Sequence, residues 1–379
     1  MNTDVYPCAA PTMDSLRLLM LAPVSGYEGF NTSQHRLQAL RALGIATTVV
    51  DSTPPQHSGL PALFARLRAW LFRNGLPVAI ADPGADAERL LAATGPDSFE
   101  VIWLEKALAI DAGCLRKLRR AAPGAMFIGF SPDDMHARHN QSLQFLEALP
   151  YYDAFLTTKS FNVDELRRMG CPRVLFVGNG YDPSAFRPLA VSTQDIERLG
   201  GDIGFIGTFE QDRFEAMRAL AERGMQVRVW GDGWDRVRTA HSNLVIEGRP
   251  LRGDDFARAC GAFKINLAFL RKANRDQQTT RSVEIPACAG FMLAERTPEH
   301  LGLFTEGEEA EFFSSVEELA EKCRQYLDDT PAREAIARRG QQRCERDGYS
   351  NAARIAQSLS ALGIGGASSL DTPARAEQE

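Results

Sequence analysis

The sequence predicts an α/β protein with two domains, each built around a parallel sheet. Three observations lead to this fold class: strand-like apolar runs alternate with helical patterns, the alternation starts a second time near residue 201, and 379 residues suit two domains. The composition, with 44% hydrophobic and 24% charged residues, is that of an ordinary globular protein. A net charge of -6 argues against general binding to nucleic acid.

The first α/β series begins with an apolar run at 16–22 that ends at Pro23. A loop at 25–31 follows, and then a helical pattern that begins at Thr32 and closes at Gly44. The next strands are expected at 45–50, 101–105, 125–130, 154–157 and 174–177, with a helix at 162–169 before the last of them.

The second series begins with a strand at 203–208 and continues the alternation. Helices are expected at 213–223 and 254–260, strands at 226–230, 243–247, 265–269 and 290–294, and a further helix is entered near Thr280. Helical patterns then dominate, at 316–328, 331–346 and 351–362.

Breaks at Arg187-Pro188 and Gly200-Gly201 separate the two series. We expect a flexible tail at 1–14, an N-terminal domain at 15–188, a linker at 189–200, a C-terminal domain at 201–350, a helix at 351–363 that packs back toward the N-terminal domain, and a second tail at 364–379. Because ligands of open α/β sheets bind beyond the carboxyl ends of the strands, the cleft between the domains is the expected site.

One segment combines the groups that a nucleotide sugar requires. Residues 271–284 carry four cations, three hydroxyls and two carboxylates, directly after a strand-like run. Cations bind a diphosphate, carboxylates accept hydrogen bonds from sugar hydroxyls, and a helix entrance favours phosphate oxygens. The predicted phosphate contacts are Arg271, Lys272, Arg275, Thr279, Thr280 and Arg281. Glu284, in the first turn of the helix, is the predicted contact of a ribose diol, and the alternative for the segment is a solvated basic loop.

Two glycine-containing turns follow strands of the second series. Gly207-Thr208 leads into a helix, so its amides and Arg213 are candidates for binding phosphate, against an ordinary tight turn with a surface arginine. Gly231 lets the backbone approach a ligand closely, and Trp234 is a candidate to pack on a base or to cap the cleft. The alternative for Trp234 is a place in the hydrophobic core.

Acidic residues follow the expected strand at 125–130. Asp133 is the candidate that orients or deprotonates an acceptor hydroxyl, with its neighbour Asp134 as the alternative. Two aspartates after a proline are also a common helix start, where they only cap the helix. A metal site formed by Asp134, His136 and His139 is disfavoured.

Cysteine usage and hydropathy bear on the compartment. The seven cysteines are scattered without a CxxC pair, so we expect reduced thiols and a cytoplasmic location. No apolar run reaches the roughly 18 residues of a membrane span, and the N-terminus lacks a signal-peptide pattern. Residues 60–76 form an amphipathic basic pattern, which either contacts an anionic membrane surface or packs on the core, the second being favoured.

The second half of the chain resembles a known family. The signature of the CgeB-like (spore maturation protein) glycosyltransferases is similar to the run from Thr280 to Thr297 (TRSVEIPACAGFMLAERT), to 304–307 (FTEG) and to 317–319 (EEL). The resemblance covers residues 200–350 closely and the first domain loosely, best at Tyr152-Asp153 and 179–188.

This resemblance implies the GT-B fold of the family 1 and family 4 glycosyltransferases: two Rossmann-like domains that face a central cleft, and a helical C-terminus. It implies that the N-terminal domain holds the acceptor and the C-terminal domain the nucleotide sugar. Family-4-type enzymes carry two acids with seven residues between them, the first contacting the donor sugar and the second the ribose. Asp276 and Glu284 take these positions, although Asp276 is shorter than the family's glutamate. Ala289 replaces a family glycine, which costs energy only if its φ is positive.

These observations predict a glycosyltransferase that moves a sugar from a nucleotide-diphosphate sugar to a hydroxyl acceptor. Asp276 and Asp133 are the candidate catalytic residues. The resemblance implies retention of anomeric configuration, and because the chain contains no Asp-x-Asp we expect no metal and no other cofactor. Two alternatives stay open: a nucleotide-sugar epimerase or hydrolase on the same fold, and a non-catalytic surface or spore structural protein.

Overall fold

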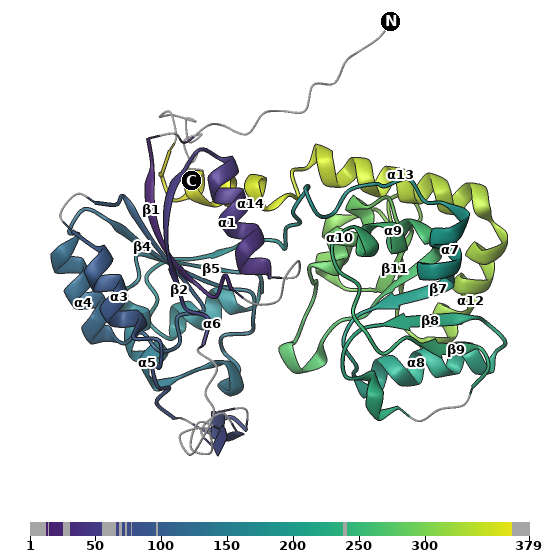
Figure 1. Cartoon of the computed structure of the whole chain (residues 1–379), viewed down its shortest axis with the longest axis horizontal. Helices are drawn as coiled ribbons and strands as arrows, with labels where there is room; N and C mark the ends of the chain where they lie inside the picture. Colours follow the sequence, from purple (N-terminus) through teal and green to yellow (C-terminus); the bar gives the residue numbers. More distant parts are fainter. Residues whose placement is uncertain are drawn as a thin grey trace, which may run out of the picture.

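The computed structural model describes Met13 and residues 15–25, 31–54, 66–67, 70–72, 74–76, 78–95, 98–237 and 241–365. The chain forms two α/β domains that lie side by side (Figure 1). Each domain contains a six-stranded parallel sheet, with the strand orders β2-β1-β3-β4-β5-β6 and β12-β11-β10-β7-β8-β9. The predicted fold class is therefore confirmed.

The N-terminal domain alternates strands and helices. Its elements are β1 (Arg17–Ala22), α1 (Thr32–Ala42), β2 (Ala46–Asp51), α3 (Asp86–Ala93), β3 (Val101–Glu105), α4 (Ala112–Ala121), β4 (Met126–Ser131), α5 (Leu143–Ala148), β5 (Ala154–Thr157), α6 (Asn162–Arg168) and β6 (Val174–Phe176). Helix α1 begins where the side chain of Asn31 accepts hydrogen bonds from the amides of Ser33 and Gln34. The central strand β3 is buried along its whole length, as a parallel strand covered on both faces must be. All six strands coincide with the predicted ones apart from end residues, whereas α3, α4 and α5 were not predicted.

The C-terminal domain repeats this pattern. Its elements are α7 (Thr193–Leu199), β7 (Gly201–Ile206), α8 (Gln211–Glu222), β8 (Val227–Trp230), β9 (Leu244–Ile246), α9 (Asp254–Ala262), β10 (Phe263–Ala268), α10 (Arg281–Ala287), β11 (Met292–Glu295), α11 (Pro298–Leu303), β12 (Glu311–Phe313), α12 (Val316–Asp328) and α13 (Thr330–Arg346). The last helix, α14 (Asn351–Ala361), joins the core of the N-terminal domain. Residues 193–199 of the expected linker form α7, which packs against α9.

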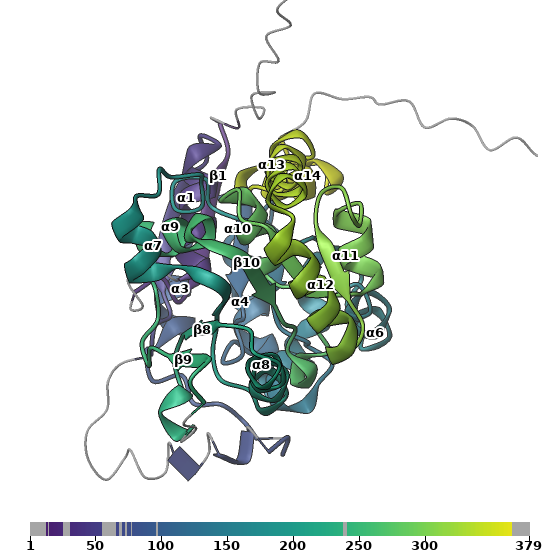
Figure 2. The same cartoon turned by 90° about the vertical axis from the view of Figure 1, so that its right-hand side faces the viewer.

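Helices cover both faces of the C-terminal sheet (Figure 2). Buried side chains of α9 and α10, including Phe256 and Val283, fill one face, and those of α8 and α12, including Met217 and Leu319, fill the other. Each face of the sheet that carries the cleft elements therefore has its own buried core.

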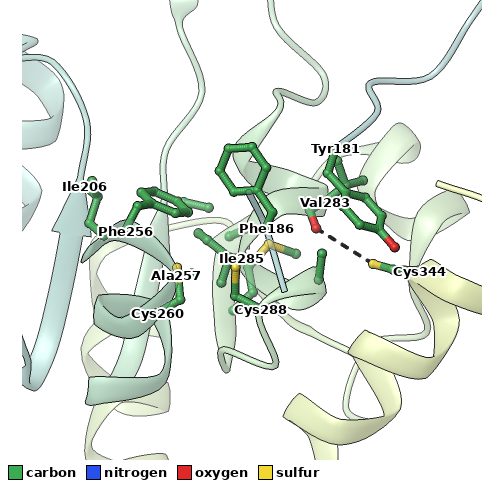
Figure 3. Close-up of a cluster of buried hydrophobic side chains, with 14 of the residues drawn as sticks. Tyr181, Phe186, Ile206, Phe256, Ala257, Cys260, Val283, Ile285, Cys288 and Cys344 are labelled. Carbon is green, nitrogen blue, oxygen red and sulfur yellow. Dashed lines mark hydrogen bonds between the residues drawn. The ribbon is translucent and has the colours of Figure 1, made fainter. Parts of the chain in front are cut away.

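The chain crosses between the domains twice, and the two crossings lie against each other. Tyr181 donates from its amide to the carbonyl of Tyr349 (3.1 Å), and its own carbonyl accepts from the amide of Asn351 (2.8 Å). Figure 3 shows Tyr181 beside Cys344 of α13, whose thiol lies 3.8 Å from the carbonyl of Val283 on α10. After the second crossing, α14 packs against α1 of the N-terminal domain.

Candidate functional site in the interdomain cleft

The carboxyl ends of both sheets face the cleft, and a pocket lies there whose space, open solvent included, is about 500 Å³. Its walls are formed by Thr32, His35, Arg36, Phe130, Pro132, Thr158, Val177, Gly178, Asn179 and Gly180 of the N-terminal domain, by Thr280 and Glu284 of the C-terminal domain, and by Asn351, Arg354 and Ile355 of α14. The pocket is thus built from three separate parts of the chain.

Glu284 is the acid that the C-terminal domain presents to this pocket. Its side chain is buried on α10, one turn after Thr280. Arg281 donates a hydrogen bond to its carboxylate from Nη1, and a second one from Nε to the carbonyl of Ile206 at the end of β7 (3.2 Å). The predicted pair of Thr280 and Glu284 therefore shares one pocket, and Arg281 fixes the acid there.

Asp276 is engaged by a cation from the opposite domain. The Nζ atom of Lys159, just after β5, lies 2.5 Å from Oδ1 of Asp276, and the two side chains are only 4% and 3% exposed. Asn274 also donates to Oδ1 (2.8 Å), and the amide of Arg271 donates to Oδ2 (3.4 Å). Lys159 was not predicted; a lysine directly after a buried strand, at the cleft end of a sheet, was the only available signal.

Arg275 also crosses the cleft instead of pointing to a free anion site. It adopts a left-handed backbone conformation (φ 46°) and donates to both oxygens of Asp134 (2.6 and 2.8 Å) and of Glu165 (3.0 and 2.9 Å). Its guanidinium lies 4.2 Å from the ring centre of Phe161. Burial acts to raise the pKa of Asp134, but hydrogen bonds from Arg275 and Asn162 outweigh it and hold that pKa below its ordinary value.

Arg271 and Lys272 lie on an exposed loop. Arg271 pairs with Glu210 (3.3 Å), and Lys272 pairs with Asp212. This is the environment of the solvated basic loop named as the alternative for the segment. A contact of either cation with phosphate stays a prediction, as it does for Arg275.

Arg213, by contrast, is a buried cation under the turn at 207–210. It donates from Nη1 to the carbonyl of Thr208 (3.1 Å) and lies 3.3 Å from a carboxylate oxygen of Glu210, while its Nε has no hydrogen-bond partner. Burial lowers its pKa. A buried, incompletely satisfied guanidinium in the first turn of α8 is suited to an anion, and a contact of Arg213 with the diphosphate stays a prediction.

Trp234 occupies the core and not the cleft surface. It is 1% exposed, packs edge-on against Phe205 and Phe209, and donates from Nε1 to the carbonyl of Gly207 (2.9 Å). Gly231 allows its turn to lie against the turn at Gly207, because a Cβ atom on residue 231 would lie only 1.9 Å from the Gly207 oxygen. The structure thus favours the core alternative for Trp234. The group that approaches Gly231 closely is the backbone of Gly207.

The remaining predicted residues lie near the cleft with other partners. The amide of Thr279 donates a hydrogen bond to Ser282 Oγ (3.0 Å). Asp133 pairs with Lys106 within the N-terminal domain, at a partly exposed position outside the pocket walls. Its action on an acceptor hydroxyl stays a prediction.

Residues 60–76 lie mostly outside the described residues, although Leu67 and Trp70 are described and more than half exposed. Within the described ranges, no helix has the length and apolar content to cross a bilayer, and no group of three or more His, Cys, Asp or Glu side chains is placed to bind a metal ion.

Comparison with solved structures identifies the architecture. HepE from Anabaena, solved in complex with UDP and glucose, matches 92% of this chain and 99% of its own chain at 14% identity, with a TM-score of 0.61. The fold is GT-B. The sucrose-phosphate synthase from Thermosynechococcus elongatus (TM-score 0.57, 12% identity, 92% of this chain and 99% of its own) and a glycosyltransferase from Rickettsia africae (TM-score 0.57, 12% identity, 91% and 97%) have the same GT-B architecture. Residues 212–360 match the family described as Glycosyl transferase-like, and no curated protein matches the chain significantly.

Proposed function

We propose that this GT-B protein is a glycosyltransferase that moves a sugar from a nucleotide-diphosphate sugar to a hydroxyl acceptor. The observation that carries the proposal is the position of Glu284: the acid lies inside the region that matches the Glycosyl transferase-like family, and it faces the pocket between the domains. The HepE structure, whose GT-B fold is similar, contains UDP and glucose. The resemblance to CgeB-like proteins and their role in spores stay predictions.

In the proposed reaction the chain's residues bind the donor and stabilise its leaving group. Glu284 accepts hydrogen bonds from the ribose hydroxyls, and the α10 entrance at Thr280 binds phosphate oxygens. When the bond from the sugar to the diphosphate breaks, Arg213 stabilises the negative charge that grows on the diphosphate. The closed cleft excludes water and so limits hydrolysis.

A nucleotide-binding experiment tests the proposal. Nucleoside diphosphates and nucleotide sugars are screened by thermal shift, and a ligand at about 100 times its Kd adds about 2.7 kcal/mol to the free energy of unfolding. Glu284→Gln keeps the volume and a partner for Arg281 but removes the charge, so we expect Kd to rise about 10- to 100-fold. Glu317→Gln, on an exposed side chain of α12, is the matched control. If no nucleoside diphosphate shifts the wild type, the proposal is wrong.

Retention and independence of metal belong to the proposal and have separate tests. The anomeric configuration of the first product formed, read by NMR, decides retention. Activity that survives dialysis against a chelator supports the expectation drawn from the absence of Asp-x-Asp, and activity that is lost and then restored by a divalent cation contradicts it.

A further inference from the structure

Arg354 on α14 is a cation at the pocket that no carboxylate neutralises. Its Nε atom is buried without a hydrogen-bond partner, and among the described residues it forms no ion pair. Asp347, the acid that influences it electrostatically, is bound instead by Arg343 (3.0 Å) and Arg346 (2.8 Å). The guanidinium lies over the ring of Tyr349, 4.6 Å from its centre. Burial lowers the pKa of Arg354, in line with the missing ion-pair partner.

The backbone beside Arg354 is shaped to hold it at the pocket. A Cβ atom on Gly178 would lie 3.0 Å from its Nη2 atom and 3.1 Å from its Cζ atom. A Cβ atom on Gly180 would lie 2.7 Å from the side-chain oxygen of Asn351. The turn at 178–180 therefore lies directly against α14. This packing holds the guanidinium of Arg354 in place although no carboxylate binds it.

The other charged groups at the pocket already have partners. Arg36 is buried and paired with Glu105, and Glu284 is paired with Arg281. Burial lowers the pKa of His35 and so favours its neutral form. The described walls of the pocket therefore carry one uncompensated positive charge, that of Arg354.

We propose that Arg354 binds phosphate oxygens of the donor's diphosphate. The inference rests on the proposed function and adds to it a residue from outside the C-terminal domain. Thr280 and Glu284, the proposed contacts of phosphate and ribose, line the same pocket, so a nucleotide held by them brings its phosphates to the wall that Arg354 forms. Guanidinium groups match phosphate oxygens with paired hydrogen bonds.

The position of Arg354 has a mechanical consequence. Because α14 packs on α1, Arg354 moves with the N-terminal domain, whereas Thr280 and Glu284 move with the C-terminal domain. A diphosphate bound by both sides links the domains, so Arg354 adds its charge to that of the C-terminal contacts only when the cleft is closed.

The test compares nucleosides with their diphosphates. Kd is measured by calorimetry for UDP and uridine, GDP and guanosine, and ADP and adenosine, on the wild type, Arg354→Gln, Arg354→Lys and Arg346→Gln. We expect Arg354→Gln to weaken the preferred diphosphate about 10- to 100-fold and to leave the matching nucleoside unchanged. Arg354→Lys restores part of the affinity because it keeps the charge and loses the fork. Arg346→Gln, an exposed arginine on α13, is the control and binds as the wild type.

The outcomes separate the inference from the proposed function. If no diphosphate binds the wild type, the proposed function fails. If diphosphates bind and Arg354→Gln and Arg354→Lys both keep the wild-type preference over nucleosides, the function stands and the inference is overturned. The third outcome is that Arg354→Gln weakens the binding of a hexose 6-phosphate but not that of the diphosphate. This result would place an acceptor phosphate at Arg354 and would also overturn the inference.

Discussion

The buried pair of Lys159 and Asp276 gives a prediction that can be worked from the structure. Lys159→Met keeps most of the side-chain volume but removes the ammonium, and it leaves the carboxylate of Asp276 nearly without solvent. The hydrogen bonds from Asn274 and the Arg271 amide remain. Removing one partner of a buried ion pair costs about 3–5 kcal/mol, because the remaining charge is left uncompensated.

The cleft sets an upper limit to this cost. Lys159 belongs to the N-terminal domain and Asp276 to the C-terminal domain, so opening the cleft returns water to the carboxylate. We therefore expect Lys159→Met to lower the free energy of unfolding by about 3 kcal/mol, or to open the cleft if opening costs less than that. Adding Asp276→Asn removes the stranded charge and recovers most of the loss.

Urea denaturation and small-angle scattering together distinguish these outcomes. Lys106→Met is the matched control, because the pair of Lys106 and Asp133 is partly exposed and within one domain, and its loss costs less than about 1 kcal/mol. If Lys159→Met costs no more than Lys106→Met and its radius of gyration equals that of the wild type, the pair does not hold the cleft.

Three further changes test local features by urea denaturation. Gly231→Ala forces a Cβ atom to 1.9 Å from a carbonyl oxygen at φ 150°, and we expect it to lower the free energy of unfolding by about 3 kcal/mol or more. Gly248→Ala, at φ 64° with no atom within 4 Å of the added Cβ, is the control and should cost about 1 kcal/mol. Equal losses in the two variants would contradict the steric argument. Burial lowers the pKa of His300, so as the pH falls the unfolded chain binds a proton at this residue before the folded chain does. The free energy of unfolding should therefore decrease below pH 6.5 by up to about 1.4 kcal/mol per pH unit. His300→Gln should show a smaller slope, and an identical slope in the variant would refute this argument. Ala289 has a φ of 57°, so Ala289→Gly should stabilise the protein by about 0.5–1 kcal/mol, and a lower denaturation midpoint would show that the strain is absent.

The fold was predictable because its signals are local. Strands of a parallel sheet are short apolar runs bounded by turn residues, and each such run in the first domain became a strand. The helices α3, α4 and α5 were not predicted, although the buried residues of α4 (Ala112, Cys114, Leu115 and Leu118) recur at helical spacing. Thr193–Leu199 was predicted as a linker because it lies between two breaks.

The site was only partly predictable, since pairing between distant residues leaves no mark in the sequence. Glu284 and Arg281 are neighbours on one helix, so their pairing follows from spacing alone. The prediction for Arg275 as a phosphate ligand rested on its neighbours in the sequence, which gave no sign that the fold brings Asp134 and Glu165 to it. Arg354 carried no signal at all, because its pocket exists only after α14 has returned to the N-terminal domain.

The cations near the cleft divide by what neutralises them, and this division argues for two separate tasks. Arg275 and Lys159 are each neutralised by carboxylates of the opposite domain, so their charge is spent on closing the cleft. Arg213 pairs with Glu210 of its own domain, and Arg354 has no carboxylate partner among the described residues. Both leave a buried Nε atom without a hydrogen-bond partner, so we expect these two guanidinium groups to meet an anion that enters the cleft. Asp276 is the carboxylate that neutralises Lys159. A sugar hydroxyl that binds Asp276 must therefore compete with an ammonium for its oxygens. If Asp276 contacts the donor sugar, it does so through the oxygen that faces the Arg271 amide, with Lys159 as the group that orients it.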